Sequence, residues 1–172
     1  MEHVNVEVKA ACADPERMRR VLRRRGVDFR GTDHQVDTYF RVPRGRLKLR
    51  EGNIENHLIW YARRDEPGPK RADVLLLATR PGSAIKEILA RVLGVRVVVD
   101  KRREIYFIDN VKFHVDAVEG LGSFVEIEAQ TVAGERSERE LLAQCRRYID
   151  LLGIEPGDLV DVSYSDLLLE RP

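Results

Sequence analysis

Charged side chains recur at every second position in several segments of this sequence. Cations, carboxylates and one histidine alternate with apolar residues at Arg46, Lys48, Arg50, Lys112, His114, Asp116, Glu126 and Glu128, and Lys101 and Arg103 are likewise two residues apart. Successive side chains of a β-strand point to opposite faces, so the charged residues of each segment share one face. Cations that hold phosphates, together with carboxylates that hold a metal ion, are what proteins use to handle a triphosphate.

The acidic residues indicate which metal such a site prefers. Glu7, Asp116, Glu126 and Glu128 are the carboxylates available to it. Cys12 and Cys145 lie far apart in the sequence, with no histidine or cysteine neighbours at metal-binding spacing. Clustered carboxylates favour a hard cation with oxygen ligands, so the pattern predicts Mg²⁺ or Mn²⁺.

Two arrangements of these strands agree with the alternation. In the first, the apolar faces pack inward and the charges coat the outside as cross-strand ion pairs. In the second, helices cover the apolar faces and the charges line the interior, which requires a multiply charged anion and counter-carboxylates inside. The periodicity by itself leaves both arrangements open.

The positions of turns and apolar residues predict the elements that carry these side chains. We expect strands at about 3–11, 35–41, 46–51, 57–64, 72–80, 96–108, 111–118 and 123–130. Few of the connections are long enough for parallel crossovers, so the strands are expected to form one antiparallel sheet that closes on itself. The predicted class is α+β.

Three helices are expected beside the strands. The first starts at Asp14 and Pro15 and runs to Gly26, the second covers 83–93, and the third covers 137–152. Ser137 and Glu140 form a capping-box pattern at the start of the third. The first helix is rich in arginine, but no aromatic residues are interleaved with its arginines, so we expect a solvated face and no nucleic-acid partner.

The composition agrees with a single folded domain over residues 1–172. Hydrophobic residues make up 43% and charged residues 34% of the chain, and the formal net charge is only +1, which gives no general attraction for nucleic acid. No apolar run reaches membrane-spanning length, and the N-terminus lacks the order of a signal peptide. We therefore expect a cytoplasmic protein with free thiols and no membrane partner.

Motifs along nearly the whole chain resemble the CYTH, or triphosphate tunnel, superfamily and its class IV adenylyl cyclase group. Asn5-Val-Glu7-Val-Lys9 is similar to the signature Glu-x-Glu-x-Lys. The segments that continue the resemblance, in order, are Asp37–Phe40, Gly45–Glu51, Leu58–Arg63 with Gly68–Asp73, Val99–Tyr106, His114–Asp116, Gly120–Glu128 and Ser163–Leu168.

The resemblance implies an eight-stranded antiparallel barrel, a tunnel with helices packed outside. It implies metal ligation by Glu7, Asp116, Glu126 and Glu128. It implies triphosphate binding by Lys9, Lys48, Arg50, Arg63, Lys101 and Arg103, with Arg46 and Lys112 as further candidates. The residues expected to act in catalysis are Glu7, Lys9, Arg63 and Lys101.

The sequence departs from the superfamily pattern at Asn5, where the signature has its first glutamate. An amide oxygen can bind Mg²⁺ but brings no charge, so one metal position is weakened, moved or lost. Three functions follow from the resemblance: an adenylyl cyclase that converts ATP to cyclic AMP and pyrophosphate, a triphosphatase acting on inorganic triphosphate, thiamine triphosphate or a nucleotide, and a binding protein without catalysis.

The last expectation is a homodimer. Val95–Val99 and Leu167–Leu169 are apolar segments beyond what one closed barrel obviously needs. The alternative is that they complete the core of a single chain and pack its C-terminal tail.

Overall fold

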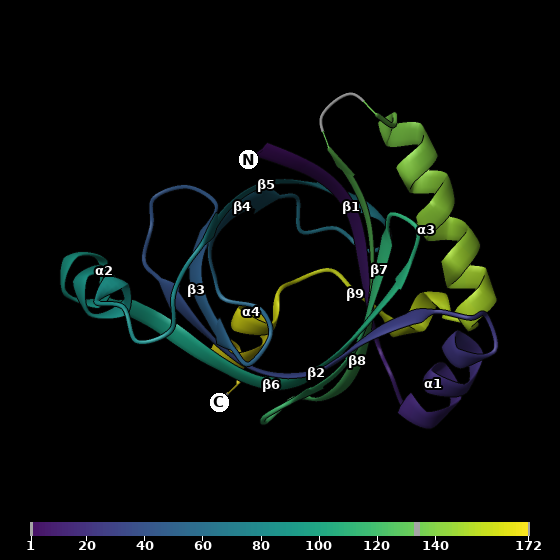
Figure 1. The fold of residues 1–172 in the computed structure, drawn as a ribbon, viewed down its shortest axis with the longest axis horizontal. Coiled ribbons are helices and arrows are strands. Elements are labelled where there is room, and N and C mark those ends of the chain that lie inside the picture. Colours follow the sequence, from purple (N-terminus) through teal and green to yellow (C-terminus); the bar gives the residue numbers. More distant parts are fainter. Residues whose placement is uncertain (1, 133–134, 172) are drawn as a thin grey trace.

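A closed antiparallel barrel organises the chain, as the computed structural model of residues 2–132 and 135–171 shows (Figure 1). Its eight strands are β1 (Glu2–Ala11), β2 (Asp28–Phe40), β3 (Arg46–Gly52), β4 (His57–Arg63), β5 (Lys70–Ala78), β6 (Val95–Ile108), β7 (Val111–Val118) and β8 (Gly122–Val132). They follow the order β5-β4-β3-β2-β6-β7-β8-β1, and β1 pairs with β5 to close the ring. This confirms the predicted eight-stranded barrel.

The helices lie around and at one end of the barrel. α1 (Pro15–Arg23) and α3 (Glu138–Leu152) pack on the outside of β1, β7 and β8, and α2 (Ile85–Leu93) stands apart on the opposite side, against β2 (Figure 1). After α3 come a short 3₁₀ helix (Pro156–Asp158), β9 (Leu159–Val160) on the edge of β1, and α4 (Tyr164–Leu169) beside β6. No helix within the described ranges is long and apolar enough to cross a bilayer.

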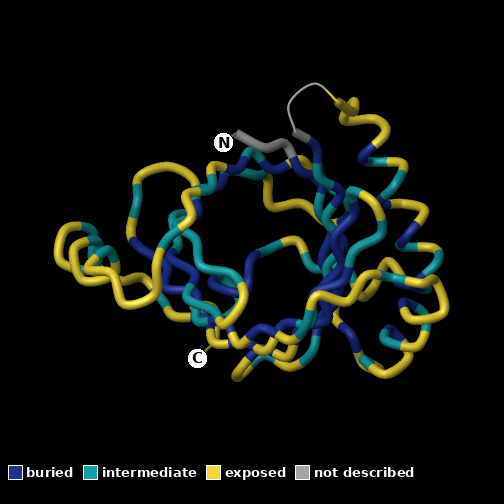
Figure 2. Tube along the Cα trace, in the orientation of Figure 1, coloured by how far each residue is buried: buried dark blue, intermediate teal, exposed yellow. Residues whose placement is uncertain are grey.

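The main hydrophobic core lies outside the barrel, between its wall and the helices. Side chains of β1, β7 and β8 that point outward meet the apolar faces of α1 and α3, as with Phe113, whose ring packs edge-on against Tyr148 at 4.8 Å. The deepest members of this core are Val6, Leu22, Phe113, Ile127, Leu141 and Leu152. Figure 2 shows this wall as a continuous buried stretch, whereas α1 and α3 are exposed on their outer sides.

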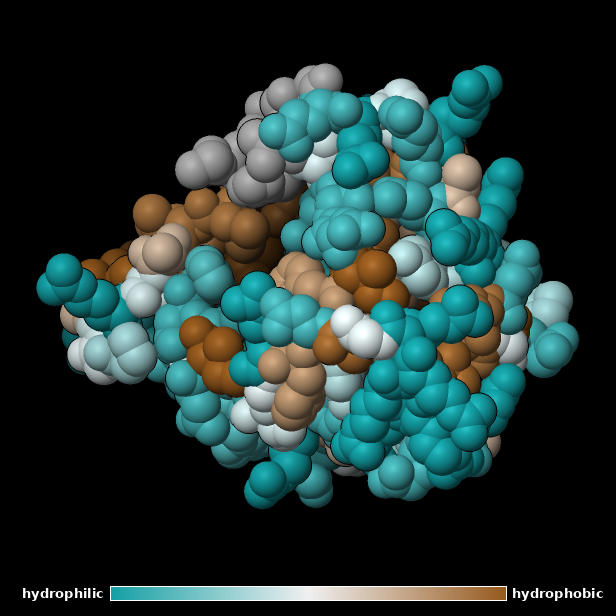
Figure 3. All heavy atoms as spheres, turned by 45° about the vertical axis from the view of Figure 1, so that its right-hand side comes forward, coloured by the Kyte–Doolittle hydropathy of each residue, from teal (hydrophilic) through white to brown (hydrophobic). Residues whose placement is uncertain are grey.

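The face that carries α1 and α3 is predominantly hydrophilic (Figure 3). The exposed arginines of this region include Arg17, Arg20, Arg23, Arg24 and Arg25. Arg19 instead bonds Glu104 at 2.6 Å and ties α1 to β6. The arginine-rich surface of the first predicted helix is therefore mostly solvated, while its apolar stripe is buried.

Several predicted boundaries were wrong by a few residues. β2 begins at Asp28, seven residues before the predicted strand. The prediction missed residues 28–34 because they are mostly polar and carry an irregularity between Phe29 and Gly31, so they show no strand alternation. α1 ends at Arg23, although Gly26 is the residue with positive φ. α3 has the predicted capping box at Ser137 and a left-handed Gly153 after its end.

Candidate functional site

The inside of the barrel holds a cavity of about 150 Å³ whose walls are densely charged. Seven cations line it among the described residues: Lys9, Lys48, Arg50, Arg63, Lys101, Arg103 and Lys112. Four carboxylates line it as well: Glu7, Glu55, Glu126 and Glu128. The charged faces therefore point inward, which decides between the two arrangements that the alternation left open. All six predicted triphosphate-binding residues lie in this lining.

Asp37 on β2 holds three of the cations in place. Its carboxylate accepts hydrogen bonds from Lys48 Nζ at 2.9 Å and from Lys101 Nζ at 2.6 Å. Arg50 donates to both of its oxygens, at 2.9 and 3.0 Å. Burial raises the pKa of Asp37, but Arg50, Lys101 and Lys48 outweigh it and hold that pKa well below its ordinary value. Asp37 is thus a buried anion that orients cations from β3 and β6.

Asp116 on β7 orients Arg103 on β6 in the same way. Arg103 donates to both oxygens of Asp116, at 2.7 and 2.5 Å, and to Glu126 at 2.6 Å. The hydroxyl of Tyr164 on α4 donates to Asp116 at 2.7 Å. Asp116 is only 1% exposed and does not reach the cavity surface, so the structure does not bring it beside Glu7 and Glu128.

The remaining cations bind carboxylates and the C-terminal segment. Arg63 Nε lies 3.1 Å from Glu7, and Lys9 Nζ lies 3.5 Å from Glu126. Lys9 also donates to the carbonyl of Val162 at 3.2 Å and lies over the ring of Tyr164, 3.9 Å from its centre. The segment from β9 to α4 therefore closes one end of the cavity, and Figure 1 shows α4 across that end.

Burial and like charges shift the protonation of this cluster. Burial lowers the pKa of Lys101 to about 7. The negative charge of Asp37 raises this pKa, and the positive charges of Arg50, Arg103 and Lys48 lower it further. The pKa of Glu7 is raised, mainly by burial. The positive charge of Arg63 lowers it, and the negative charges of Glu126 and Glu128 raise it further. Such shifts are expected where cations and carboxylates lie close together away from water.

Glu128 is the carboxylate that no cation holds at ion-pair distance within the described ranges. It accepts hydrogen bonds from the amide groups of Asn5 and, at 3.1 Å, of Gln130. The other side of the Asn5 amide, Oδ1, is buried without any hydrogen-bond partner, although Asn5 lines the cavity. A buried acceptor without a donor requires an explanation, such as an ion that the site accepts.

The oxygen atoms of this region fit a hard divalent cation. Glu7 and Glu128 are paired opposite each other on β1 and β8, and Glu126 lies two residues from Glu128 on the same face. In the described part of the chain, no three acidic, histidine or cysteine side chains already stand close enough to enclose an ion, because Glu7 and Glu126 are turned to cations. Three carboxylates and the free Asn5 Oδ1 nevertheless form the oxygen-only donor set that Mg²⁺ and Mn²⁺ prefer.

The strands β4 and β5 give the cavity a different wall. Ile59, Val74 and Leu76 line it there, beside the phenol rings of Tyr39 and Tyr61. These residues belong to a second apolar cluster that Val99, Phe124 and Tyr164 complete inside the barrel. The cavity is therefore charged along β1, β3, β6, β7 and β8 and partly apolar along β4 and β5.

Some residues of the site escaped the sequence analysis. Asp37 and Tyr164 lie in motifs that carried the resemblance, but alternation gave no sign that they hold Arg50 or Asp116. Glu55 lies in a loop, where no periodicity marks an inward side chain. Of the further candidates, Lys112 lines the cavity, whereas Arg46 lies outside that lining and pairs with Asp65 and Asp166 at 2.7 and 2.8 Å.

A sequence model of the CYTH domain matches residues 3–164. The chain belongs to the CYTH family. A protein of Methanocaldococcus jannaschii with the provisional name adenylate cyclase is 22% identical to this CYTH protein over 95% of its chain and 98% of the relative. The match therefore extends over nearly the full length of both proteins.

Solved structures share the fold. The PH1012 protein of Pyrococcus horikoshii superposes with a TM-score of 0.81 at 25% identity, covering 95% of this chain and 98% of the other. A Hippeastrum protein provisionally named adenylyl cyclase, and described as having a dominant triphosphatase activity, superposes with a TM-score of 0.63 at 13% identity, covering 98% and 94%. The second likeness is one of fold alone.

Proposed function

We propose that this CYTH protein is a metal-dependent enzyme acting on a nucleoside triphosphate, with adenylyl cyclase activity as the first candidate. The observation that supports it most is the row of cations inside the barrel, which Asp37 and Asp116 orient from behind. A triphosphate carries the charge that such a row needs. Preorganised cations stabilise charge that develops during phosphoryl transfer without reorganising at the moment of reaction.

The residues have distinct roles in this proposal. Lys9, Lys48, Arg50, Arg63, Lys101 and Arg103 bind the phosphates, while Glu7, Glu126, Glu128 and Asn5 Oδ1 hold Mg²⁺ or Mn²⁺. Phosphate oxygens would replace Glu7 on Arg63, and would replace Glu126 on both Lys9 and Arg103, which would free the two carboxylates for the metal. The bound metal supplies neutralisation of phosphate charge and a lower pKa for a nearby hydroxyl. Asp116 holds Arg103 in position.

The cyclase reaction places the 3′-oxygen of ATP in line with the α-phosphorus. A bond forms between these atoms, the bond from the α-phosphorus to the bridging oxygen breaks, pyrophosphate leaves and the hydroxyl proton passes to water. The cations fix the phosphates, and positioning of this kind supplies much of the rate increase in intramolecular attack. The apolar wall at Ile59, Val74 and Leu76 offers a place for the uncharged part of a nucleotide.

Triphosphatase activity is the second candidate, because the same cations serve it. Water then attacks the terminal phosphorus, and the bond to its bridging oxygen breaks. The Hippeastrum protein is named as an adenylyl cyclase and described as having a dominant triphosphatase activity. Both reactions are therefore included in the test.

The deciding experiment supplies purified protein with Mg²⁺ or Mn²⁺ and, separately, ATP, inorganic triphosphate and thiamine triphosphate, and identifies the products by chromatography. Cyclic AMP with pyrophosphate supports the cyclase, and release of orthophosphate supports the triphosphatase. Glu7→Gln and Glu128→Gln are expected to abolish turnover, whereas Glu51→Gln, which alters a surface pair with Lys86, is the matched control. Turnover that persists in excess EDTA contradicts the metal requirement, and binding without turnover supports a non-catalytic protein.

A further inference from the structure

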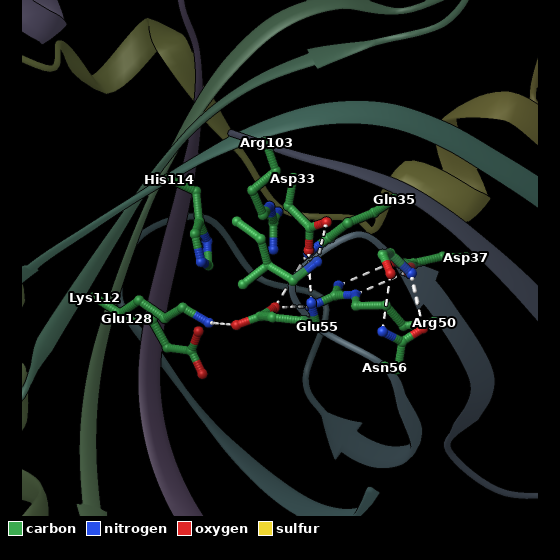
Figure 4. A network of polar contacts seen from close by, with 12 residues as sticks. Asp33, Gln35, Asp37, Arg50, Glu55, Asn56, Arg103, Lys112, His114 and Glu128 are labelled. Carbon is green, nitrogen blue, oxygen red and sulfur yellow. Dashed lines mark hydrogen bonds and ion pairs between the residues drawn. The ribbon is translucent and has the colours of Figure 1, made fainter. Parts of the chain in front are cut away.

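The loop between β3 and β4 places a carboxylate directly against the phosphate-binding cations. Glu55 Oε2 lies 3.0 Å from Arg50 and accepts a hydrogen bond from Gln35 at 3.1 Å. Its other oxygen accepts a hydrogen bond from Lys112 Nζ. Figure 4 shows Glu55 reaching between Arg50 on β3 and Lys112 on β7, across one side of the cavity.

The backbone of this loop is fixed by its own contacts. Asp33 accepts hydrogen bonds from the backbone N–H groups of Ile54 and Glu55, at 2.8 and 2.9 Å. Gly52 allows this approach, since a Cβ there would stand 2.7 Å from the Asp33 carboxylate. Asn56 bonds both backbone groups of Gly52, at 3.2 and 2.8 Å. The carboxylate of Glu55 is therefore presented by a rigid turn.

Glu55 differs from the other anions that serve the cations. Asp37 and Asp116 lie behind the cations, are 1% exposed and do not line the cavity. Glu55 lines it, and its side chain is 18% exposed. For Lys112, Glu55 is the ion-pair partner found in the described residues. Asp37 and Asp116 orient cations, whereas Glu55 occupies the side of a cation that an incoming phosphate needs.

We propose that Glu55 is a fixed internal anion that ends the phosphate-binding row and limits the number of phosphates that the cavity accepts. The idea rests on the proposed function, since it concerns the same cavity. Arg50 and Lys112 both pair with Glu55, so a phosphate group that approaches either cation on that side meets the negative charge of Glu55. Repulsion between like charges that cannot move apart selects against the longer ligand.

The test is calorimetric titration of the whole protein, in EDTA to prevent turnover, with inorganic triphosphate and with inorganic tetraphosphate. Wild type is expected to bind triphosphate more tightly, although tetraphosphate carries more charge. Glu55→Gln is expected to raise the tetraphosphate affinity by about tenfold more than the triphosphate affinity, since it removes one close like charge. Glu55→Asp keeps the charge and should keep the wild-type ratio, and Glu51→Gln, on β3 just before the loop, is the surface control.

Each outcome decides a separate point. An equal rise for both ligands in Glu55→Gln, or no rise, overturns the length limit. A wild type that prefers tetraphosphate also overturns it, which keeps the idea testable should Glu55→Gln fail to fold, as a melting curve would reveal. If wild type binds triphosphate but Glu55→Gln leaves the ratio of tetraphosphate to triphosphate affinity unchanged, the length limit is wrong and the proposed function stands. A wild type that binds neither ligand in EDTA overturns the limit, which concerns the metal-free cavity, while the turnover assay with Mg²⁺ or Mn²⁺ decides the proposed function separately.

Discussion

The wall made of β1, β7 and β8 differs from the wall made of β4 and β5 in which side of the strands is apolar. On the first, Phe113 and Ile127 point outward under α1 and α3, and Glu126 and Lys112 point into the cavity. On the second, Ile59 points inward, while on the outer face Leu77 is 59% exposed. A helix layer provides the covered wall with a core of its own, so that its inner face can be charged. On the bare wall the apolar side chains that are buried lie inside, and those on the outer face, such as Leu77, stay exposed.

The largest effect is expected from removing the buried charge behind the cations. Asp37→Asn leaves Lys48, Arg50 and Lys101 without their common anion, so the free energy of unfolding should fall by about 3–5 kcal/mol. Asp73→Asn is the control on the bare wall, where Asp73 pairs with Arg71 at 2.9 Å and both are 49% exposed. Water screens that pair, so its loss should cost less than about 1 kcal/mol. Equal losses in urea unfolding would contradict the contrast between the buried charges inside the barrel and the screened pair on the outer face of the bare wall.

The two apolar clusters should also respond differently to truncation. Phe113 is fully buried between the covered wall and α3, and Phe113→Ala is expected to cost about 3–5 kcal/mol. Ile59 borders the cavity, so less new empty space is created, and Ile59→Ala should cost about 2 kcal/mol. Urea unfolding with comparison of the slopes measures both. A larger loss for Ile59→Ala would place the dominant core inside the barrel.

Lys101, one of the cations inside the barrel, predicts a pH dependence of ligand binding. The pKa of Lys101 is about 7, against 10.5 ordinarily, so above pH 7 its amine is mostly neutral in the free protein. A bound phosphate raises that pKa again, and binding at pH 8 should take up a proton. For this charge alone, triphosphate affinity should fall about fivefold from pH 7 to pH 8. Between pH 7 and 10.5 the unfolded chain binds more protons at this site, so Lys101 makes stability rise with pH there.

Calorimetry at pH 8 in two buffers of different ionisation enthalpy measures the proton uptake. Arginine stays charged at pH 7 and pH 8, so Lys101→Arg should lose the proton uptake that Lys101 contributes. The same uptake in both proteins would show that another group titrates.

The smallest effect concerns the outer surface. Val97 and Val99 pack inside the barrel, as do Leu167 and Leu168, so much of the two segments that prompted the homodimer prediction completes the core. Val98 stays 47% exposed. Val98→Ser should change stability by less than about 0.5 kcal/mol while weakening self-association. Light scattering at micromolar concentration checks both proteins, and a wild type seen only at 19.8 kDa contradicts the homodimer.

Alternation predicted which residues share a face, and the structure agrees for Lys101 and Arg103 on β6 and for Glu126 and Glu128 on β8. Turn and capping signals predicted α3 closely, because Ser137 and Gly153 act through neighbours in the sequence. The first half of β2 was missed, since its polar residue Asp33 is buried by long-range contacts with the backbone of Ile54 and Glu55. The roles of the metal-binding candidates remain predictions.

The sequence by itself determined a part of each barrel strand, the charged side of several strands and, through its motifs, the family. The strands and their charged sides depend on residues close together in the sequence, because side chains alternate in direction along a strand. Alternation left the direction of the charges open, and the tertiary structure confirmed the inward direction that the resemblance implied. The tertiary structure alone showed that Asp37, Asp116 and Glu55 meet their cations. Those pairings join residues of different elements. Their energies depend on burial and distance, and neither quantity is present until the barrel closes.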